Sequence, residues 1–130
     1  MQANESSPTT GRGVVMTGTI FAGLAVALGA FAAHAMKAHY DADALRTFET
    51  GVRYQMFHAL ALLVCGALQA RGMATLVASR LFAAGIVLFS GSLYGLALTE
   101  AKWLGPVTPI GGVLFLAGWV ALAIASRQRT

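Results

Sequence analysis

The sequence predicts an all-α fold, an integral membrane bundle of four transmembrane helices with an amphipathic interfacial segment before the second helix. Three observations predict this class. Of the 130 residues, 57% are hydrophobic and 11% are charged, whereas a soluble domain carries about 25% charged residues. Four apolar stretches, at about residues 14–35, 52–70, 81–99 and 107–126, are each long enough to cross a hydrocarbon core of about 30 Å. Three of these stretches contain no formally charged residue.

The polar ends of the chain flank this transmembrane domain of residues 14–126. Residues 1–13 are polar and have no apolar period, so we expect a flexible tail, and residues 127–130 form a basic C-terminal tail. A cleaved signal peptide is the alternative for the first stretch, because Ala33 to Ala35 offers an A-x-A-like site. The apolar stretch is longer than the roughly 7 to 15 residues of a signal peptide's apolar region, which favours a retained span.

Residues 36–50 change to an amphipathic pattern. Asp41 or Asp43 can cap a helix whose apolar edge contains Leu45, Phe48 and Val52. We therefore expect a helix at the membrane interface that bends into the second span.

The second span sorts its residues by polarity. At about 100° per residue, one stripe contains Gly51, Gln55, His58, Leu62, Cys65, Gly66 and Gln69, and the opposite side contains Met56, Leu60, Leu63, Val64 and Ala67. A polar group exposed to hydrocarbon is costly unless it finds a partner. We expect the first set to face the bundle and the second set to face lipid.

Seven side chains form a candidate intramembrane polar cluster. They are His34, Tyr54, Gln55, His58, Ser90, Ser92 and Tyr94. His34 ends the first span and His58 lies near the start of the second, so antiparallel neighbouring helices would let the two face each other. The cluster has two interpretations, hydrogen bonding between helices or a relay for protons or metal ions.

No enzymatic site is predicted. The spans lack a nucleophile, a base and an orienting group at suitable spacing, so we assign no catalytic residues, no cofactor and no enzymatic activity. Three histidines and one cysteine provide no cysteine pair, and no metal site is assigned.

Glycines within the spans predict close helix contacts. The candidates for helix packing are Gly29, Gly51, Gly91, Gly95, Gly111 and Gly112. Gly91 and Gly95 form a GxxxG step, which lets two backbones approach in membrane helices.

The charge distribution bears on partners and topology. The nine basic residues are scattered at the ends of spans, which argues against nucleic acid as a partner. Five of them, Arg12, Arg71, Arg80, Arg127 and Arg129, lie on the side of the termini, and four lie on the other side. The positive-inside rule then predicts a multi-pass protein of the plasma (inner) membrane with both termini in the cytoplasm.

Four ordered motifs carry a resemblance to a known family. They are GAFAAHAMK (residues 29–37), FETGVRYQMFHALALL (48–63), LFSGSLYGLALT (88–99) and LGPVTPIGG (104–112). Together they resemble the "domain of unknown function 423" family of small bacterial membrane proteins, which has eukaryotic relatives among the small transmembrane proteins. The resemblance implies a four-helix membrane fold and no agreed activity.

Two hypotheses for function remain. The first is a non-enzymatic accessory or scaffold protein that packs against lipid, other membrane proteins or copies of itself. The alternative is a transport component for a small solute, protons or metal ions that uses His34, Gln55 and His58. Four short spans enclose little volume, so a conduit would require an oligomer.

Overall fold

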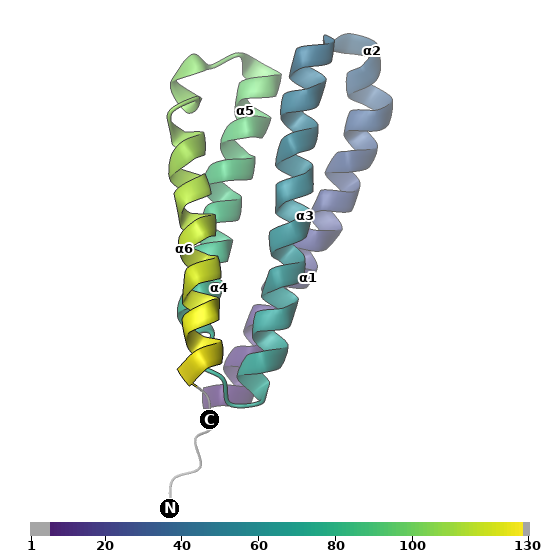
Figure 1. Cartoon of the computed structure of the whole chain (residues 1–130). Coiled ribbons are helices and arrows are strands. Elements are labelled where there is room, and N and C mark those ends of the chain that lie inside the picture. Colours follow the sequence, from purple (N-terminus) through teal and green to yellow (C-terminus); the bar gives the residue numbers. More distant parts are fainter. Residues whose placement is uncertain (1–5, 129–130) are drawn as a thin grey trace, which may run out of the picture.

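Four long helices run up and down in a bundle, as seen in the computed structural model, which describes residues 6–128 (Figure 1). The first consists of α1 (Ser6–Phe31), the π-helical turn η1 (Ala32–Met36) and α2 (Lys37–His39), and the second is α3 (Ala42–Ala70). The third consists of α4 (Leu76–Gly85), the π-helical turn η2 (Ile86–Ser90) and α5 (Gly91–Thr99). After the short 3₁₀ turn η3 (Lys102–Leu104), α6 (Val107–Gln128) completes the bundle.

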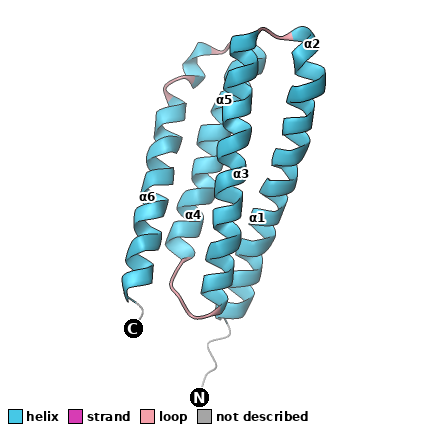
Figure 2. Cartoon of the chain, turned by 45° about the vertical axis from the view of Figure 1, so that its right-hand side comes forward, coloured by secondary structure: helices cyan, strands magenta, loops and turns pink. Residues whose placement is uncertain are grey.

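These four helices are each long and apolar enough to cross a membrane. The described residues contain helices joined by short loops and no strand, which confirms the predicted all-α class (Figure 2). Helix α1 begins and α6 ends at the same end of the bundle (Figure 1).

The helices are not equivalent in their burial. Helix α3 packs against α1 on one side and against α4, η2 and α5 on the other, and α6 packs against α4 and η2. The buried share of the apolar part of each span is 44% in α3 and 17% in the spans containing α1 and α6. Helix α3 is therefore the central helix, and α1 and α6 are the outer ones.

The N-terminal region differs from the expected tail. Residues 6–13 belong to α1, whereas residues 1–5 lie outside the described part of the chain, as do residues 129–130 of the predicted basic tail. At Gly11 this helix packs on the end of α3. A Cβ atom placed on Gly66 would lie 2.8 Å from the carbonyl oxygen of Gly11, so the two backbones meet there.

The amphipathic segment is continuous with the second span. Asp41 is the N-cap of α3, and its carboxylate accepts a hydrogen bond of 2.8 Å from the backbone N–H of Ala44. The helix that starts there is unbroken to Ala70, so the amphipathic residues form its first turns.

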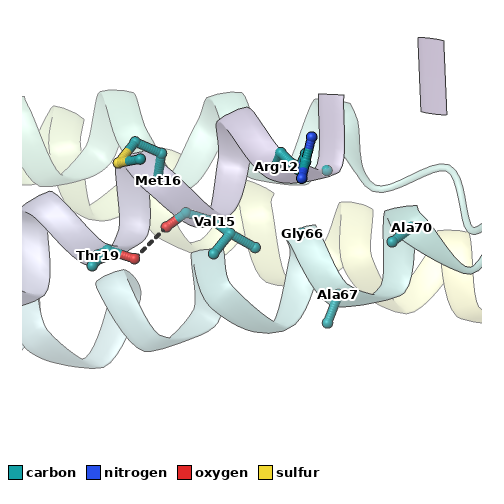
Figure 3. Close-up of a pocket in the computed structure, with 8 residues that line it drawn as sticks. Arg12, Val15, Met16, Thr19, Gly66, Ala67 and Ala70 are labelled. Atoms are coloured by element: carbon teal, nitrogen blue, oxygen red, sulfur yellow. Dashed lines mark hydrogen bonds between the residues drawn. The ribbon is translucent and has the colours of Figure 1, made fainter. Parts of the chain in front are cut away.

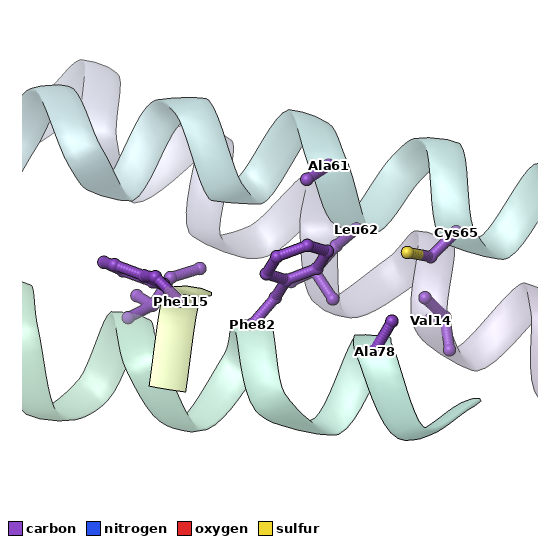
Figure 4. Packing of buried hydrophobic residues seen from close by; sticks show 8 residues of the cluster. Val14, Ala61, Leu62, Cys65, Ala78, Phe82 and Phe115 are labelled. Atoms are coloured by element: carbon purple, nitrogen blue, oxygen red, sulfur yellow. The ribbon is translucent and has the colours of Figure 1, made fainter. Parts of the chain in front are cut away.

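Two apolar clusters fill the interior. The larger one lies in the half of the bundle nearer the termini, and Figure 4 shows Val14, Ala61, Leu62, Cys65, Ala78, Phe82 and Phe115 within it. The smaller one lies toward the opposite end and contains Ala32, Met36, Phe48 and Ala97.

Candidate functional site

The polar stripe of α3 faces the interior, as predicted. Gln55 is 3% exposed and His58 is 4% exposed, whereas Leu60 and Val64 on the opposite face are 48% and 52% exposed. Met56, Leu63 and Gln69 are partly buried. Polarity along a single helical wheel thus identified the inward face of the central helix.

Gln55 joins three helices. Its side-chain Nε2 donates a hydrogen bond of 2.8 Å to the carbonyl oxygen of Phe21 in α1. Its Oε1 accepts a hydrogen bond of 2.6 Å from the hydroxyl of Tyr94 in α5. Contacts of this kind are worth about 0.6 kcal/mol each on average in a membrane bundle.

A second contact between α3 and the third span lies next to Gln55. The Ser90 hydroxyl, at the end of η2, donates a hydrogen bond of 2.7 Å to the carbonyl oxygen of Gly51. The ring of Tyr94 covers the same glycine, because a Cβ atom on Gly51 would lie 2.7 Å from its Cε1 atom. A side chain at position 51 would therefore displace the ring that carries the hydroxyl bound to Gln55.

Ser92 belongs to a different contact. Its hydroxyl lies 2.6 Å from the hydroxyl of Thr108 in α6 and also donates to the carbonyl oxygen of Phe89 at 2.9 Å. Ser92 thus fastens α5 to the first turn of α6 and takes no part in the Gln55 network.

His58 is held by two groups that fix its protonation pattern. Its Nδ1 lies 2.7 Å from the carbonyl oxygen of Tyr54, and its Nε2 lies 3.1 Å from the indole nitrogen of Trp119 in α6. A carbonyl only accepts and an indole N–H only donates, so both contacts are made when the neutral ring carries its proton on Nδ1. The ring also stacks on Phe115 at a centroid distance of 3.6 Å.

His34 does not join this cluster, and the prediction that it faces His58 is wrong. His34 is exposed in η1, near the far end of the first span. Helices α1 and α3 are antiparallel neighbours, but Gln55 meets α1 at Phe21. Thirteen residues separate Phe21 from His34, which is about 20 Å along the helix. Within residues 6–128 no group of three His, Cys, Asp or Glu side chains is arranged to hold a metal ion.

An open groove lies beside His58. Its lining includes Tyr54, His58, Phe89, Phe115 and Trp119, and its volume is about 450 Å³. The Tyr54 ring is 38% exposed and lies 4.9 Å, between centroids, from Phe89. Most of the walls are aromatic, and the polar side chains among them are those of Tyr54, His58 and Trp119.

The predicted packing glycines have different roles. A Cβ atom on Gly111 would collide with the backbone of Phe89 in η2, and one on Gly95 would lie 2.6 Å from Leu104 Cδ1. Gly29 and Gly112 leave room for an ordinary contact, with the nearest atoms at 3.5 and 3.8 Å. Gly91 has no such atom within 4 Å among the described residues, so within the GxxxG step the close contact is made by Gly95.

Other close contacts were not predicted as such. Gly85 would place a Cβ atom 2.5 Å from the ring of Phe115, and Gly118 would place one 2.6 Å from the ring of Phe82. Trp119 was not predicted either. A tryptophan in mid-span was the available signal, because this residue prefers the membrane interface and its N–H needs a partner when it is buried.

The chain is therefore a four-span α-helical integral membrane protein, and hydrogen bonds between side chains join its helices in the interior. The chain matches the family described as "Protein of unknown function (DUF423)" over residues 28–112, and it belongs to that family.

Relatives that match over most of their length support the assignment. The chain is 44% identical over 113 residues to UPF0382 membrane protein SAB0533 of Staphylococcus aureus, covering 86% of this chain and 93% of the relative. It is 44% identical over 115 residues to UPF0382 membrane protein YwdK of Bacillus subtilis, covering 86% and 94%. It is 48% identical over 103 residues to a UPF0382 membrane protein of Haemophilus influenzae, covering 78% and 82%. No solved structure matches the chain.

Proposed function

We propose that this protein is a non-enzymatic accessory or scaffold protein that uses its outer helix α6 to contact another membrane protein. One observation carries the proposal. Among the described residues, the interior polar side chains have hydrogen-bond partners within the chain, with the exception of the Gln69 Oε1 atom, while the outward surface of α6 is apolar. The interior polar groups hold the bundle together, which leaves the outer surface as the region available for function.

The two most buried polar side chains of α3 illustrate the first half of this argument. Both ends of the Gln55 amide and both nitrogens of the His58 ring have partners within the chain. A substrate or ion could use either group only after a helix contact had been broken.

The second half concerns α6. Leu116 is 68% exposed, Val113 is 62% exposed and Val120 is 59% exposed. Leu116 and Val113 also form one edge of the aromatic groove beside His58. A ridge of bulky side chains beside a groove is a surface on which a partner helix can interdigitate.

Photo-crosslinking in native membranes tests the proposal. A photoreactive residue at Leu116 should give a discrete protein adduct, which mass spectrometry then identifies. The matched position is Val26 on α1, which is 64% exposed and should give mainly lipid adducts.

A second substitution links the adduct to the groove. Val113→Trp fills the groove from an exposed position and should abolish the adduct, whereas Val77→Trp, at a 63% exposed position on α4, should leave it unchanged. Identical adducts from Leu116 and Val26, or only lipid adducts from both, would contradict the proposal.

We further propose that the protein lies in the plasma (inner) membrane with both termini in the cytoplasm. The support is charge, because five basic residues of the sequence fall on the side of the termini, Arg12, Arg71, Arg80, Arg127 and Arg129, and four fall on the other side. Basic residues in short loops favour the cytoplasmic side.

A transport component is the second candidate. The observation in its favour is that His58, a residue type that exchanges protons near neutral pH, lines an open groove within the span. His34 plays no part in this version. Proton or metal flux into proteoliposomes that falls on His58→Ala substitution would support it, and equal flux with and without the protein would exclude it.

A further inference from the structure

A second groove lies at the end of the bundle that carries the arginines. Its walls come from Gly11, Arg12, Val15, Met16 and Thr19 of α1 and from Gly66, Ala67 and Ala70 of α3, and its volume is about 660 Å³ (Figure 3). The hollow is a consequence of the close crossing of the two backbones. Where Gly11 meets Gly66, α3 presents only hydrogens and methyl groups to the outside.

The groove wall is apolar below its mouth. The hydroxyl of Thr19 donates a hydrogen bond of 2.7 Å to the carbonyl oxygen of Val15, as the dashed line in Figure 3 shows, so this hydroxyl is already engaged. Val15, Met16 and Ala67 supply hydrocarbon. From Arg12 to Thr19 the wall spans seven residues, about 10 Å along the helix. That length is about one third of a hydrocarbon core of about 30 Å.

The mouth of the groove is cationic. Arg12 is exposed and is the second residue of the apolar span that begins at Gly11. Arg71, Arg80 and Arg127 lie at the same end of the bundle. The carboxylates within residues 6–128 belong to the opposite end, because Asp41, Asp43 and Glu49 lie at the start of α3 and Glu100 caps the end of α5. A guanidinium forms paired hydrogen bonds with phosphate oxygens, so the end of the protein at which this groove opens is complementary to an anionic group.

We propose that the groove binds one anionic phospholipid, with an acyl chain in the apolar trough and the headgroup phosphate on Arg12. An apolar trough that lies along the span and ends at a guanidinium matches the layout of such a lipid, whose charge sits at the interface above its chains. The proposal is independent of the partner protein suggested for α6, because the groove lies between α1 and α3.

Native mass spectrometry of the purified full-length protein tests this assignment. The detergent-solubilised protein is titrated with phosphatidylglycerol or with phosphatidylcholine of the same acyl chains, and the lipid-bound fraction is measured. Attraction between one basic residue and an anionic lipid is worth about 1 kcal/mol, so we expect phosphatidylglycerol to bind about fivefold more tightly.

Two variants distinguish the contribution of the lipid headgroup to binding from the contribution of the acyl chain. Arg12→Gln should weaken phosphatidylglycerol binding about fivefold, to the level of phosphatidylcholine, and Ala67→Leu should weaken binding of both lipids by filling the trough. The matched controls are Arg127→Gln, which removes a charge at the same end, and Ala84→Leu, which enlarges an exposed alanine on α4. Both controls should bind like the wild type.

Three results would overturn the proposal. They are equal binding of the two lipids by the wild-type protein, an equal loss from Arg127→Gln and Arg12→Gln, and unchanged binding by Ala67→Leu. All four substituted positions are exposed, and equal thermal unfolding midpoints verify that the variants are folded.

Discussion

Removing the hydroxyl of Tyr94 tests whether the hydrogen bond to Gln55 holds α5 on α3. Tyr94→Phe deletes the donor that lies 2.6 Å from Gln55 Oε1 and leaves that oxygen without this partner in a side chain that is only 3% exposed. The phenyl ring of the variant would keep the packing against Phe48, whose centroid lies 4.7 Å from that of the Tyr94 ring. The change in stability therefore measures the contribution of the hydroxyl group alone. We expect the free energy of unfolding to decrease by about 1 to 2 kcal/mol.

A double-mutant cycle isolates this contact. Gln55→Met removes the acceptor with little change in volume, and the coupling energy between Tyr94→Phe and Gln55→Met should be about 1 kcal/mol. The free energy of unfolding is measured in mixed micelles of dodecyl maltoside and dodecyl sulfate by circular dichroism and tryptophan fluorescence. The control cycle pairs Tyr94→Phe with Thr108→Val, because Thr108 bonds to Ser92. The effects of Tyr94→Phe and Thr108→Val on the free energy of unfolding should be additive within about 0.5 kcal/mol. A Tyr94–Gln55 coupling as small as the control would refute the reasoning.

Three further predictions follow from burial and topology. Gly111→Ala should cost about 3 kcal/mol in stability or prevent folding, because the methyl group meets the backbone of Phe89, whereas Gly91→Ala should leave the unfolding free energy unchanged or raised. Cys65 is fully buried and should react slowly with a membrane-permeant maleimide, while a cysteine at position 64, which is 52% exposed in the wild type, should react readily in a Cys65→Ser background. Equal labelling rates would contradict the inward orientation of the α3 stripe. Reporter fusions after Ala101 and at the C-terminus should give opposite sides of the membrane, and signals from the same side would refute four spans.

The fold and the inward face of α3 were predictable from the sequence because each depends on local information. The length of an apolar stretch decides whether it can span a membrane, and the period of the helix decides which side chains share a face. Gln55 and His58 lie on the buried side for that reason. The capping residue was predicted as either Asp41 or Asp43, and Asp41 is the N-cap of α3 in the structure.

The depth of each residue was not predictable in the same way. The second span is expected to start near residue 52, and the amphipathic segment before it extends the same helix back to Ala42. His58 therefore lies 16 residues, about 24 Å, along the helix from its first residue. His34 remains near the end of the first span, so the two histidines lie at different depths. Polarity gives the direction of a side chain, whereas depth depends on where the helix begins.

The packing role of each glycine was also not predictable from the sequence. Gly91 belongs to a GxxxG step and is exposed, while Gly111 lies in a similarly apolar stretch and meets the backbone of Phe89. The two glycines differ because α6 packs on η2, which places the backbone of Phe89 beside Gly111. The role of Trp119 depends on the same packing, since its partner His58 lies 61 residues earlier in the chain.

The order in which the helices are synthesised gives the central position of α3 a kinetic consequence. Two acceptor atoms on α3, Gln55 Oε1 and His58 Nε2, bond to donors that are synthesised later. Tyr94 follows Gln55 by 39 residues, and Trp119 follows His58 by 61 residues. At about 5 to 20 residues per second, the second delay lasts about 3 to 12 s. During that interval Gln55 Oε1 and His58 Nε2 lack their final partners, whereas the partners of Gln55 Nε2 and His58 Nδ1, the carbonyl groups of Phe21 and Tyr54, are already synthesised. Both acceptors on α3 are therefore paired only after α6 has been added to the bundle.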